Sequence, residues 1–89
     1  MKNIYKYILS PLVEYIEIPS EKILSCETQG NNIVVYVIID TEDKYLRKFD
    51  FQVIGTGHDI YCNIDDYTFL NTVKLENDTL VFHVFYKKI

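Results

Sequence analysis

The chain has 89 residues, of which 48% are hydrophobic and 25% are charged. A chain of this length builds one hydrophobic core, so we expect a single β domain over residues 1–89 and no separate catalytic domain. The composition is globular and too apolar for a disordered protein. It lacks Ala and Trp but contains eight Tyr and five Phe together with many Ile and Val, a mixture that favours strands over helices.

The charge balance excludes one class of partner. Nine Lys and Arg residues against 13 Asp and Glu residues give a net charge of -4, which disfavours general nucleic-acid binding because clustered positive charge supplies most of that affinity. A small anionic ligand in a locally basic pocket stays open. Arg47 is the only arginine and therefore the only side chain whose planar guanidinium can bind such an anion through two parallel hydrogen bonds.

Cysteine usage and hydropathy indicate an intracellular protein. Cys26 and Cys62 lack the Cys-x-x-Cys spacing of zinc and redox sites, so we expect reduced thiols. The N-terminal segment has no uninterrupted apolar stretch of signal-peptide length, and no run approaches the ~18 apolar residues of a transmembrane helix. We therefore expect neither export nor contact with a membrane.

Short segments of alternating or continuous apolar residues, separated by turn residues, predict the strands. In chain order these are residues 3–9, 13–18, 22–28, 33–39, 48–53, 67–76 and 79–86. Hairpin turns are expected at residues 29–32 and at Asn77 and Asp78, because Gly, Asn and Asp tolerate the positive φ of tight turns. Residues 11–17 or 58–66 have room for one short helix.

The segment 33–39 reads IVVYVII and is apolar on both faces. Such a strand lies in the middle of a sheet and needs a covering layer on each side, supplied by a helix or by another subunit. A short chain has little surface of its own for this purpose, so we expect a homo-oligomer. The predicted fold class is all-β: a small antiparallel sandwich or open barrel of six to seven strands, with at most one short helix.

The most distinctive local sequence is GTGH, formed by Gly55, Thr56, Gly57 and His58 after the strand at 48–53. Backbone N–H groups in a glycine turn can cradle an anion, the Thr56 hydroxyl can donate to it, and His58 can donate or transfer a proton. The same residues also suit a plain turn whose polar side chains satisfy loop backbone groups. The sequence leaves both interpretations open.

His83 lies in the apolar string LVFHVFY, where it is either a hydrogen-bonded core residue or a ligand-binding one. Neither His83 nor His58 occurs in the His-x-Thr or His-x-Ser unit of two-histidine phosphoesterases, so no catalytic residue is predicted. The acidic residues and Cys62 that follow His58 match no zinc or calcium loop. We expect no metal ion and no other cofactor.

Tyr5 and Tyr7 lie two residues apart and share one face of the first strand, beside Lys6. Tyrosine supplies a flat apolar surface with a polar tip, which suits both base stacking and subunit contacts. The candidate ligand-binding residues are therefore Tyr5, Lys6, Tyr7, Arg47, Gly55, Thr56, Gly57, His58 and His83.

Four segments together carry a resemblance to a known family. They are Ile-x-Lys-Tyr at residues 4–7, Pro19 followed by Lys-Ile-Leu-Ser at 22–25, Gly-Thr-Gly-His at 55–58 and Leu-Val-Phe-His-Val-Phe at 80–85. Over nearly its whole length the chain resembles a short all-β protein family of phages and prophages whose function is unknown. The resemblance implies a compact β domain made in the cytoplasm of a bacterial host cell.

Three functions are consistent with this resemblance. The first is an antagonist of host defence that binds a small, anionic, nucleotide-derived immune signal and sequesters it without cleavage, as a homo-oligomer. The alternative is an inhibitor that binds a bacterial defence protein, for which the apolar strand 33–39 and the negative net charge are the support. A phosphodiesterase that cleaves the signal is third, and it needs His58 and His83 to face each other across one cleft.

Overall fold

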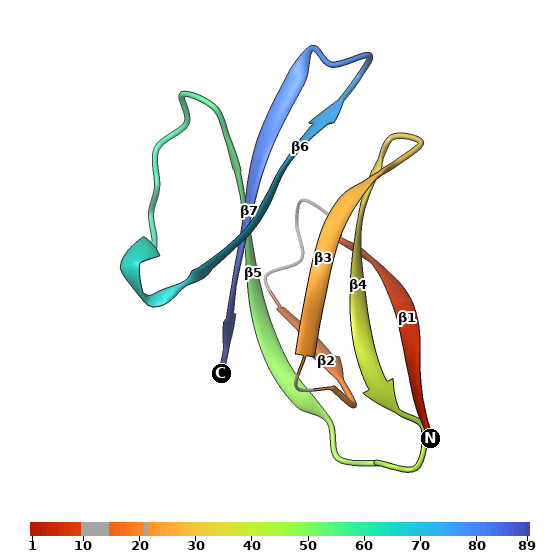
Figure 1. The fold of residues 1–89 in the computed structure, drawn as a ribbon. Coiled ribbons are helices and arrows are strands. Elements are labelled where there is room, and N and C mark those ends of the chain that lie inside the picture. Colours follow the sequence, from red (N-terminus) through yellow and green to blue (C-terminus); the bar gives the residue numbers. More distant parts are fainter. Residues whose placement is uncertain (10–14, 21) are drawn as a thin grey trace.

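The chain folds into β-strands arranged in two layers (Figure 1). A computed structural model describes residues 1–9, 15–20 and 22–89. Within these ranges, a 3-10 turn, η1 (Ile64–Asp66), lies in the long connection between the fifth and sixth strands. The strands are β1 (Lys2–Leu9), β2 (Tyr15–Ile18), β3 (Lys22–Gln29), β4 (Asn32–Asp40), β5 (Arg47–Gly55), β6 (Thr68–Leu75) and β7 (Leu80–Lys88).

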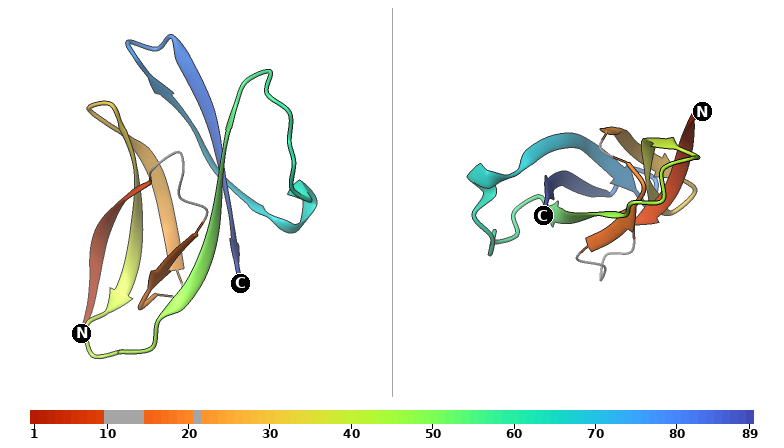
Figure 2. Two further views of the ribbon diagram at one scale, coloured as in Figure 1. Left: turned by 180° about the vertical axis from the view of Figure 1, so that it is seen from behind. Right: turned by 90° about the horizontal axis from the view of Figure 1, so that it is seen from below.

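The strands form two antiparallel sheets. A three-stranded sheet has the order β1-β4-β3, and a four-stranded sheet has the order β2-β5-β7-β6. The sheets lie beside each other and do not close into a barrel (Figure 2). The all-β prediction is confirmed, and of the two expected architectures the structure is the sandwich.

The core lies between the sheets and follows from the two-residue period of a strand. Phe49 and Phe51 of β5 point inward and are buried, whereas Asp50 between them points outward. From the two sheets, Val84 of β7 and Val37 of β4 are each fully buried. Because burying one such side chain contributes roughly 1.5–3 kcal/mol, a slip of one residue in any of these strands would be strongly disfavoured.

Side chains and backbone groups join the edge strands β3 and β6 of the two sheets. The Asn71 amide donates to the backbone carbonyl of Cys26 at 2.9 Å. At the neighbouring hairpin tips, the Asn31 amide donates to Glu76 Oε1 at 2.8 Å, and the Glu76 N–H donates to Asn31 Oδ1 at 3.3 Å. These bonds hold the sandwich together along one side.

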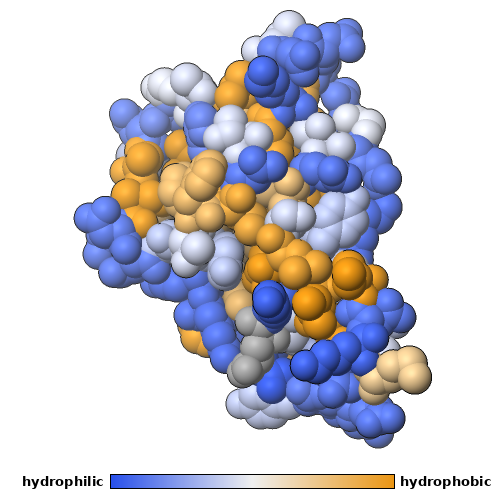
Figure 3. Space-filling model, viewed as in Figure 1, coloured by the Kyte–Doolittle hydropathy of each residue, from blue (hydrophilic) through white to orange (hydrophobic). Residues whose placement is uncertain are grey.

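The strand that was expected to need covering on both faces is β4. It is the central strand of its sheet, and the second sheet packs on its inner face only. On the outer face Val34 is 1% exposed, and its partners on the neighbouring strands are Ile8 and Glu27. Ile4 and Ile8 on this face are each 59% exposed, and no second layer from the described part of the chain covers them. Figure 3 shows apolar side chains gathered where Figure 1 draws the lower half of this sheet.

Both predicted hairpin turns are present. Gly30 has a φ of 60° and is the first of two residues between β3 and β4, as in a type II′ turn. Between β6 and β7, the residues Glu76, Asn77 and Asp78 have φ values of 51°, 54° and 68°. Asn and Asp adopt this left-handed conformation readily, whereas Glu does so rarely.

The short helix expected in residues 58–66 is only the 3-10 turn η1. The alternative position, residues 11–17, lies partly outside the described residues. Its described end belongs to the strand β2. No helix in the described ranges is long and apolar enough to cross a membrane.

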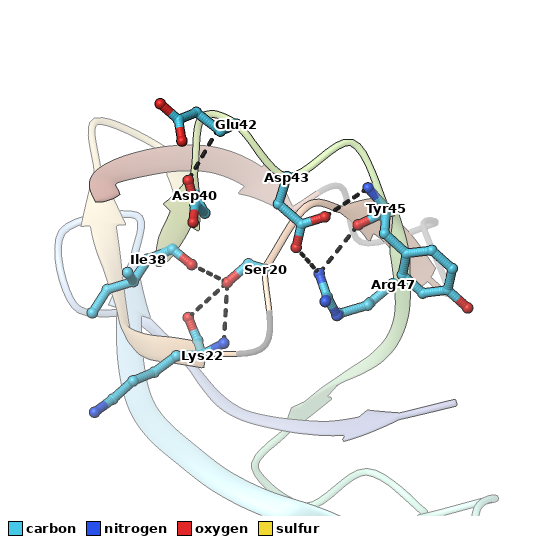
Figure 4. A network of polar contacts seen from close by, with 8 residues as sticks. All are labelled: Ser20, Lys22, Ile38, Asp40, Glu42, Asp43, Tyr45 and Arg47. Atoms are coloured by element: carbon cyan, nitrogen blue, oxygen red, sulfur yellow. Dashed lines mark hydrogen bonds and ion pairs between the residues drawn. The ribbon is translucent and has the colours of Figure 1, made fainter. Parts of the chain in front are cut away.

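Ser20 is the buried polar residue that fastens the connection between β2 and β3, and it is 3% exposed. Its hydroxyl donates to the backbone carbonyl of Ile38 and accepts the N–H of Lys22 at 3.0 Å (Figure 4). One hydroxyl therefore satisfies backbone groups of two strands that lie beside each other.

We expect Ser20→Ala to lower the free energy of unfolding by about 1–3 kcal/mol, because it removes two partly buried hydrogen bonds, to the Ile38 carbonyl and the Lys22 N–H, each worth about 0.5–1.5 kcal/mol. Urea denaturation followed by circular dichroism measures this loss. Ser25→Ala, at an exposed position of β3, is the control and should change stability by less than about 0.5 kcal/mol. Equal effects of the two substitutions would contradict the role given to Ser20.

Candidate functional site

The GTGH sequence forms a tight turn at the end of β5. The His58 N–H donates to the Gly55 carbonyl at 3.0 Å, which closes a four-residue turn. Gly57 is the third residue of this turn and has a φ of 85°, a conformation that glycine adopts without strain. A positive φ at this position alone is typical of a type II turn. The turn interpretation of the sequence therefore describes the backbone here.

The imidazole of His58 folds back over Gly55. A Cβ atom built on Gly55 would lie 2.5 Å from His58 Nδ1, closer than real atoms approach. Gly55 pairs with Phe82, which packs against the core, so the ring covers the inward face of this strand end. Glycine at position 55 thus allows the close approach of the ring, whereas glycine at position 57 suits the positive backbone angle.

A groove runs along the edge of β5 beside this turn. We call it the turn groove; its volume is ≈ 550 Å³, within the range of small-molecule sites. One wall is the end of β5, and the other is the connection that follows it. Its lining residues are Gln52, Val53, Ile54, Gly55, Gly57, His58, Asp59 and Tyr61.

The backbone of β5 presents hydrogen-bonding groups to the turn groove. The Thr56 N–H donates to Val81 and the Ile89 N–H donates to Lys48, so the even-numbered residues of β5 bond to β7. Because bonding alternates along an antiparallel strand, the N–H and C=O of Val53, a residue that lines the groove, point away from β7. Among the described residues, the pairing of β2 with β5 extends from Arg47 to Asp50.

The 56–67 loop, which forms the outer wall of the turn groove, is fastened at both ends. At its start, Thr56 Oγ1 lies 2.8 Å from His83 Nε2. At its end, the Tyr67 hydroxyl donates to the Asp50 carboxylate, and the Lys87 ammonium lies 5.0 Å from the centre of the Tyr67 ring. The wall is therefore tied back to β5 and β7.

His83 is held between two threonines. Its Nε2 faces Thr56, and its Nδ1 lies 2.9 Å from Thr72 Oγ1. His83 pairs with Ile54, whose side chain points outward, whereas the His58 ring covers the inward side of Gly55. The two imidazoles thus lie on opposite faces of the sheet, and the structure does not bring them together across one cleft.

Arg47 lies at the other end of β5 from the turn. It is the first residue of the strand and Gly55 is the last, which separates them by about 26 Å at ~3.3 Å per residue. The guanidinium donates to the Asp43 carboxylate at 2.9 Å and to the Tyr45 carbonyl at 3.2 Å (Figure 4). The Tyr45 N–H and the Arg47 guanidinium both lower the pKa of Asp43.

The three candidates on β1 belong to the other sheet. Tyr5 and Tyr7 point inward, as do their partners Val37 and Val35 on β4. Lys6 points outward and donates to the Gln29 side chain. Of the predicted site residues, the structure gathers Gly55, Thr56, Gly57 and His58 in one turn, with His83 bonded to it, and places Tyr5, Lys6, Tyr7 and Arg47 elsewhere.

The turn groove also contains residues that the sequence did not single out. Tyr61 is 93% exposed, and Asp59 and Gln52 contribute polar side chains. The local sequence does not predict that Tyr61 is exposed, because its exposure depends on the path of the loop beside β5. No Lys or Arg occurs among the described residues that line the groove. No cluster of three or more potential metal ligands occurs among the residues that the structure describes.

Comparison with known proteins identifies a family and nothing further. Residues 1–89 match the family described as "Domain of unknown function (DUF7352)". The chain belongs to this family. No curated protein and no solved structure matches it. Membership therefore agrees with the expected family of unknown function but supplies no activity.

We expect Gly55→Ala to displace the His58 ring, because the new methyl group would occupy its position. The cost is about 0.5–1.5 kcal/mol of stability, because His58 is exposed and its ring can rotate aside into a less favoured side-chain conformation. In a His58→Ala background the same substitution should be nearly neutral, so the double-mutant cycle gives a coupling energy of this size. Thermal denaturation of the four proteins measures it, and additive effects would show that the ring does not rest on Gly55.

The Tyr67–Asp50 contact gives a pH dependence. The hydrogen bond to the Asp50 carboxylate, followed by desolvation, raises the pKa of Tyr67 to about 12 from 10.0. The stabilisation is thus complete below pH 10 and is lost as the pH rises toward 12. We expect Tyr67→Phe to lose less stability than the parent protein across this interval, as measured by urea midpoints. Tyr45→Phe is the control, and an unchanged slope in Tyr67→Phe would contradict the assignment.

Proposed function

We propose that this chain is a non-catalytic binding protein that holds the planar, hydrogen-bonding part of a small nucleotide-derived ligand in the turn groove. The observation that carries the proposal is the groove itself. It places a strand edge, the His58 imidazole and an exposed tyrosine around one space of small-molecule size.

The groove supplies the two interactions that recognise a nucleobase. Tyr61, at 93% exposure, offers a flat face on which a ring can stack. The outward N–H and C=O of Val53, with His58 and Asp59, offer donors and acceptors for the ring edge. The proposed orientation therefore puts the base in the groove.

The phosphate end of such a ligand would lie outside the groove. Among the lining residues only His58 can carry a positive charge, and Asp59 repels an anion. Arg47 and Lys6 do not compensate, because they lie at the far end of β5 and on the other sheet. The proposed ligand is therefore still a nucleotide, but the groove would recognise only the base of that nucleotide.

Sequestration is favoured over cleavage by the arrangement of the potential catalytic groups. His58 and His83 lie on opposite faces of the sheet, so they cannot act together on one phosphate. Cys26 is buried, which raises the pKa of its thiol to about 11 and keeps it protonated. Together with the resemblance to phage proteins, this supports an antagonist of host defence that removes a nucleotide signal from solution.

The test is isothermal titration calorimetry with a panel of nucleosides, nucleoside monophosphates and cyclic dinucleotides. We expect Tyr61→Ala to weaken binding about 5- to 150-fold, because stacking on an aromatic ring is worth about 1–3 kcal/mol per base. Tyr45→Ala is a matched control, since Tyr45 is 71% exposed but lies outside the groove. Its affinity should equal that of the parent protein.

Two results would contradict the proposal. One is the absence of binding to every member of the panel, with no small molecule retained in native mass spectra of protein purified from phage-infected cells. The other is binding that Tyr61→Ala and Tyr45→Ala weaken equally. In either case inhibition of a defence protein becomes the better explanation, because apolar residues are exposed on the outer face of the first sheet.

A further inference from the structure

The strand β1 is a long edge whose outer side has no partner in the described part of the chain. It pairs with β4 over all eight residues, from Lys2 to Leu9, with no break in register. Three of its apolar side chains are exposed: Ile4 and Ile8 at 59% each and Tyr5 at 45%. Proteins usually guard such an edge with a bulge, a proline or an outward charge, since it can pair with another strand.

The hydrogen-bonding groups on this edge can be assigned. The Thr41 N–H donates to the Met1 carbonyl, so the odd-numbered residues of β1 bond to β4 and the even-numbered ones point away from it. The Ile4 N–H agrees with this assignment, because it donates to the side chain of the preceding Asn3 at 2.7 Å. The outward donors and acceptors therefore belong to Lys2, Ile4, Lys6 and Ile8.

Of the two lysines of β1, Lys2 lies at the first position of the strand, and Lys6 in the middle is turned away from the edge. The Lys6 ammonium lies across the outer face of β4 and donates to Gln29 of β3. The middle of β1 is thus left with isoleucine and tyrosine side chains and with backbone groups.

We propose that β1 pairs antiparallel with β1 of a second copy of this chain, about a two-fold axis at Lys6. The two three-stranded sheets would then form one six-stranded sheet. This pairing specifies the interface and the two-fold symmetry of the expected homo-oligomer. It does not depend on the proposed ligand.

The sequence of β1 is complementary to itself in this register. With Lys6 opposite Lys6, Ile4 lies opposite Ile8 and Tyr5 opposite Tyr7. Facing residues in an antiparallel pair share one side of the sheet. Ile4 and Ile8 thus meet on the outer face and the tyrosines meet on the inner face. Shifting the axis to Tyr5 instead sets Ile4 against Lys6 and Ile8 against Lys2, which matches apolar side chains with charged ones.

In this register the two Lys6 side chains face each other, and repulsion between their positive charges weakens the dimer. The position of each ammonium group reduces this repulsion. Each Lys6 ammonium is directed to Gln29, two strands inward from the edge. We therefore expect Lys6→Gln to strengthen dimerisation several-fold and added salt to act in the same direction. Seven residues of each β1, Asn3 to Leu9, are paired in this register and form a small interface, so the dimer should dissociate on dilution.

The decisive variant is Ile8→Pro. Proline removes the outward N–H at position 8 and leaves the bonds to β4 intact, because those belong to the odd-numbered residues. By symmetry it deletes two hydrogen bonds of the interface. Ile8→Thr is the matched control, since it keeps the N–H and the β-branched shape. Circular dichroism and thermal denaturation of dilute samples confirm that both variants fold.

Sedimentation velocity over about 10 µM to 1 mM is the measurement. We expect the parent protein and Ile8→Thr to shift from monomer toward dimer with concentration, and Ile8→Pro to stay monomeric. A parent protein that remains monomeric throughout would overturn the proposal. A dimer that Ile8→Pro leaves unchanged would place the interface elsewhere and overturn it as well.

Disulfide trapping tests the register. In a Cys62→Ser background, a mixture of Tyr5→Cys and Tyr7→Cys chains should form a mixed disulfide, because these positions face each other in a non-hydrogen-bonded pair. Tyr5→Cys alone should not crosslink. Efficient crosslinking of Tyr5→Cys with itself would instead place the axis at Tyr5 and overturn the register. Failure of ligand titration leaves each of these outcomes unaffected.

Discussion

The packing of the two inner faces against each other is the constraint on which the rest of the structure depends. Val37 from one sheet and Phe49 and Val84 from the other are almost wholly removed from solvent. Because side chains alternate along a strand, these contacts also decide which residues face outward. The outward positions of His83, Lys6 and Asp50 are consequences of that choice, as are the polar contacts that each of them makes.

The local sequence predicted the strands well because each strand has its own pattern of apolar residues and is followed by turn-forming residues. Gly30 and the pair Asn77 and Asp78 turn the chain where expected, since their residue types tolerate positive φ. Glu76 escaped notice because Glu rarely adopts that conformation. Here it does so in contact with Asn31 from the other sheet, a long-range partner that no local pattern reveals.

The candidate site was predictable only in part, for the same reason. The residues from Gly55 to His58 come together because one turn contains them. Whether Arg47 and Tyr5 lie near that turn depends on the order of the strands in the sheets, which the sequence does not reveal. In the observed order both residues lie far from the turn. Conversely, Tyr61 and Gln52 reach the turn groove through the path of the 56–67 loop, which is set by its anchors at Thr56 and Tyr67.

The three left-handed residues at the tip of the β6–β7 hairpin have a consequence for chirality. The backbones of Glu76, Asn77 and Asp78 lie in the left-handed region, which D-amino acids prefer, so a D residue would fit this backbone with less strain than the natural L residue. At 89 residues the chain is within reach of stepwise chemical synthesis. Asn77 and Asp78 are thus positions where D-amino acids can replace the natural ones, whereas at Glu76 the redirected side chain would lose its hydrogen bond to Asn31.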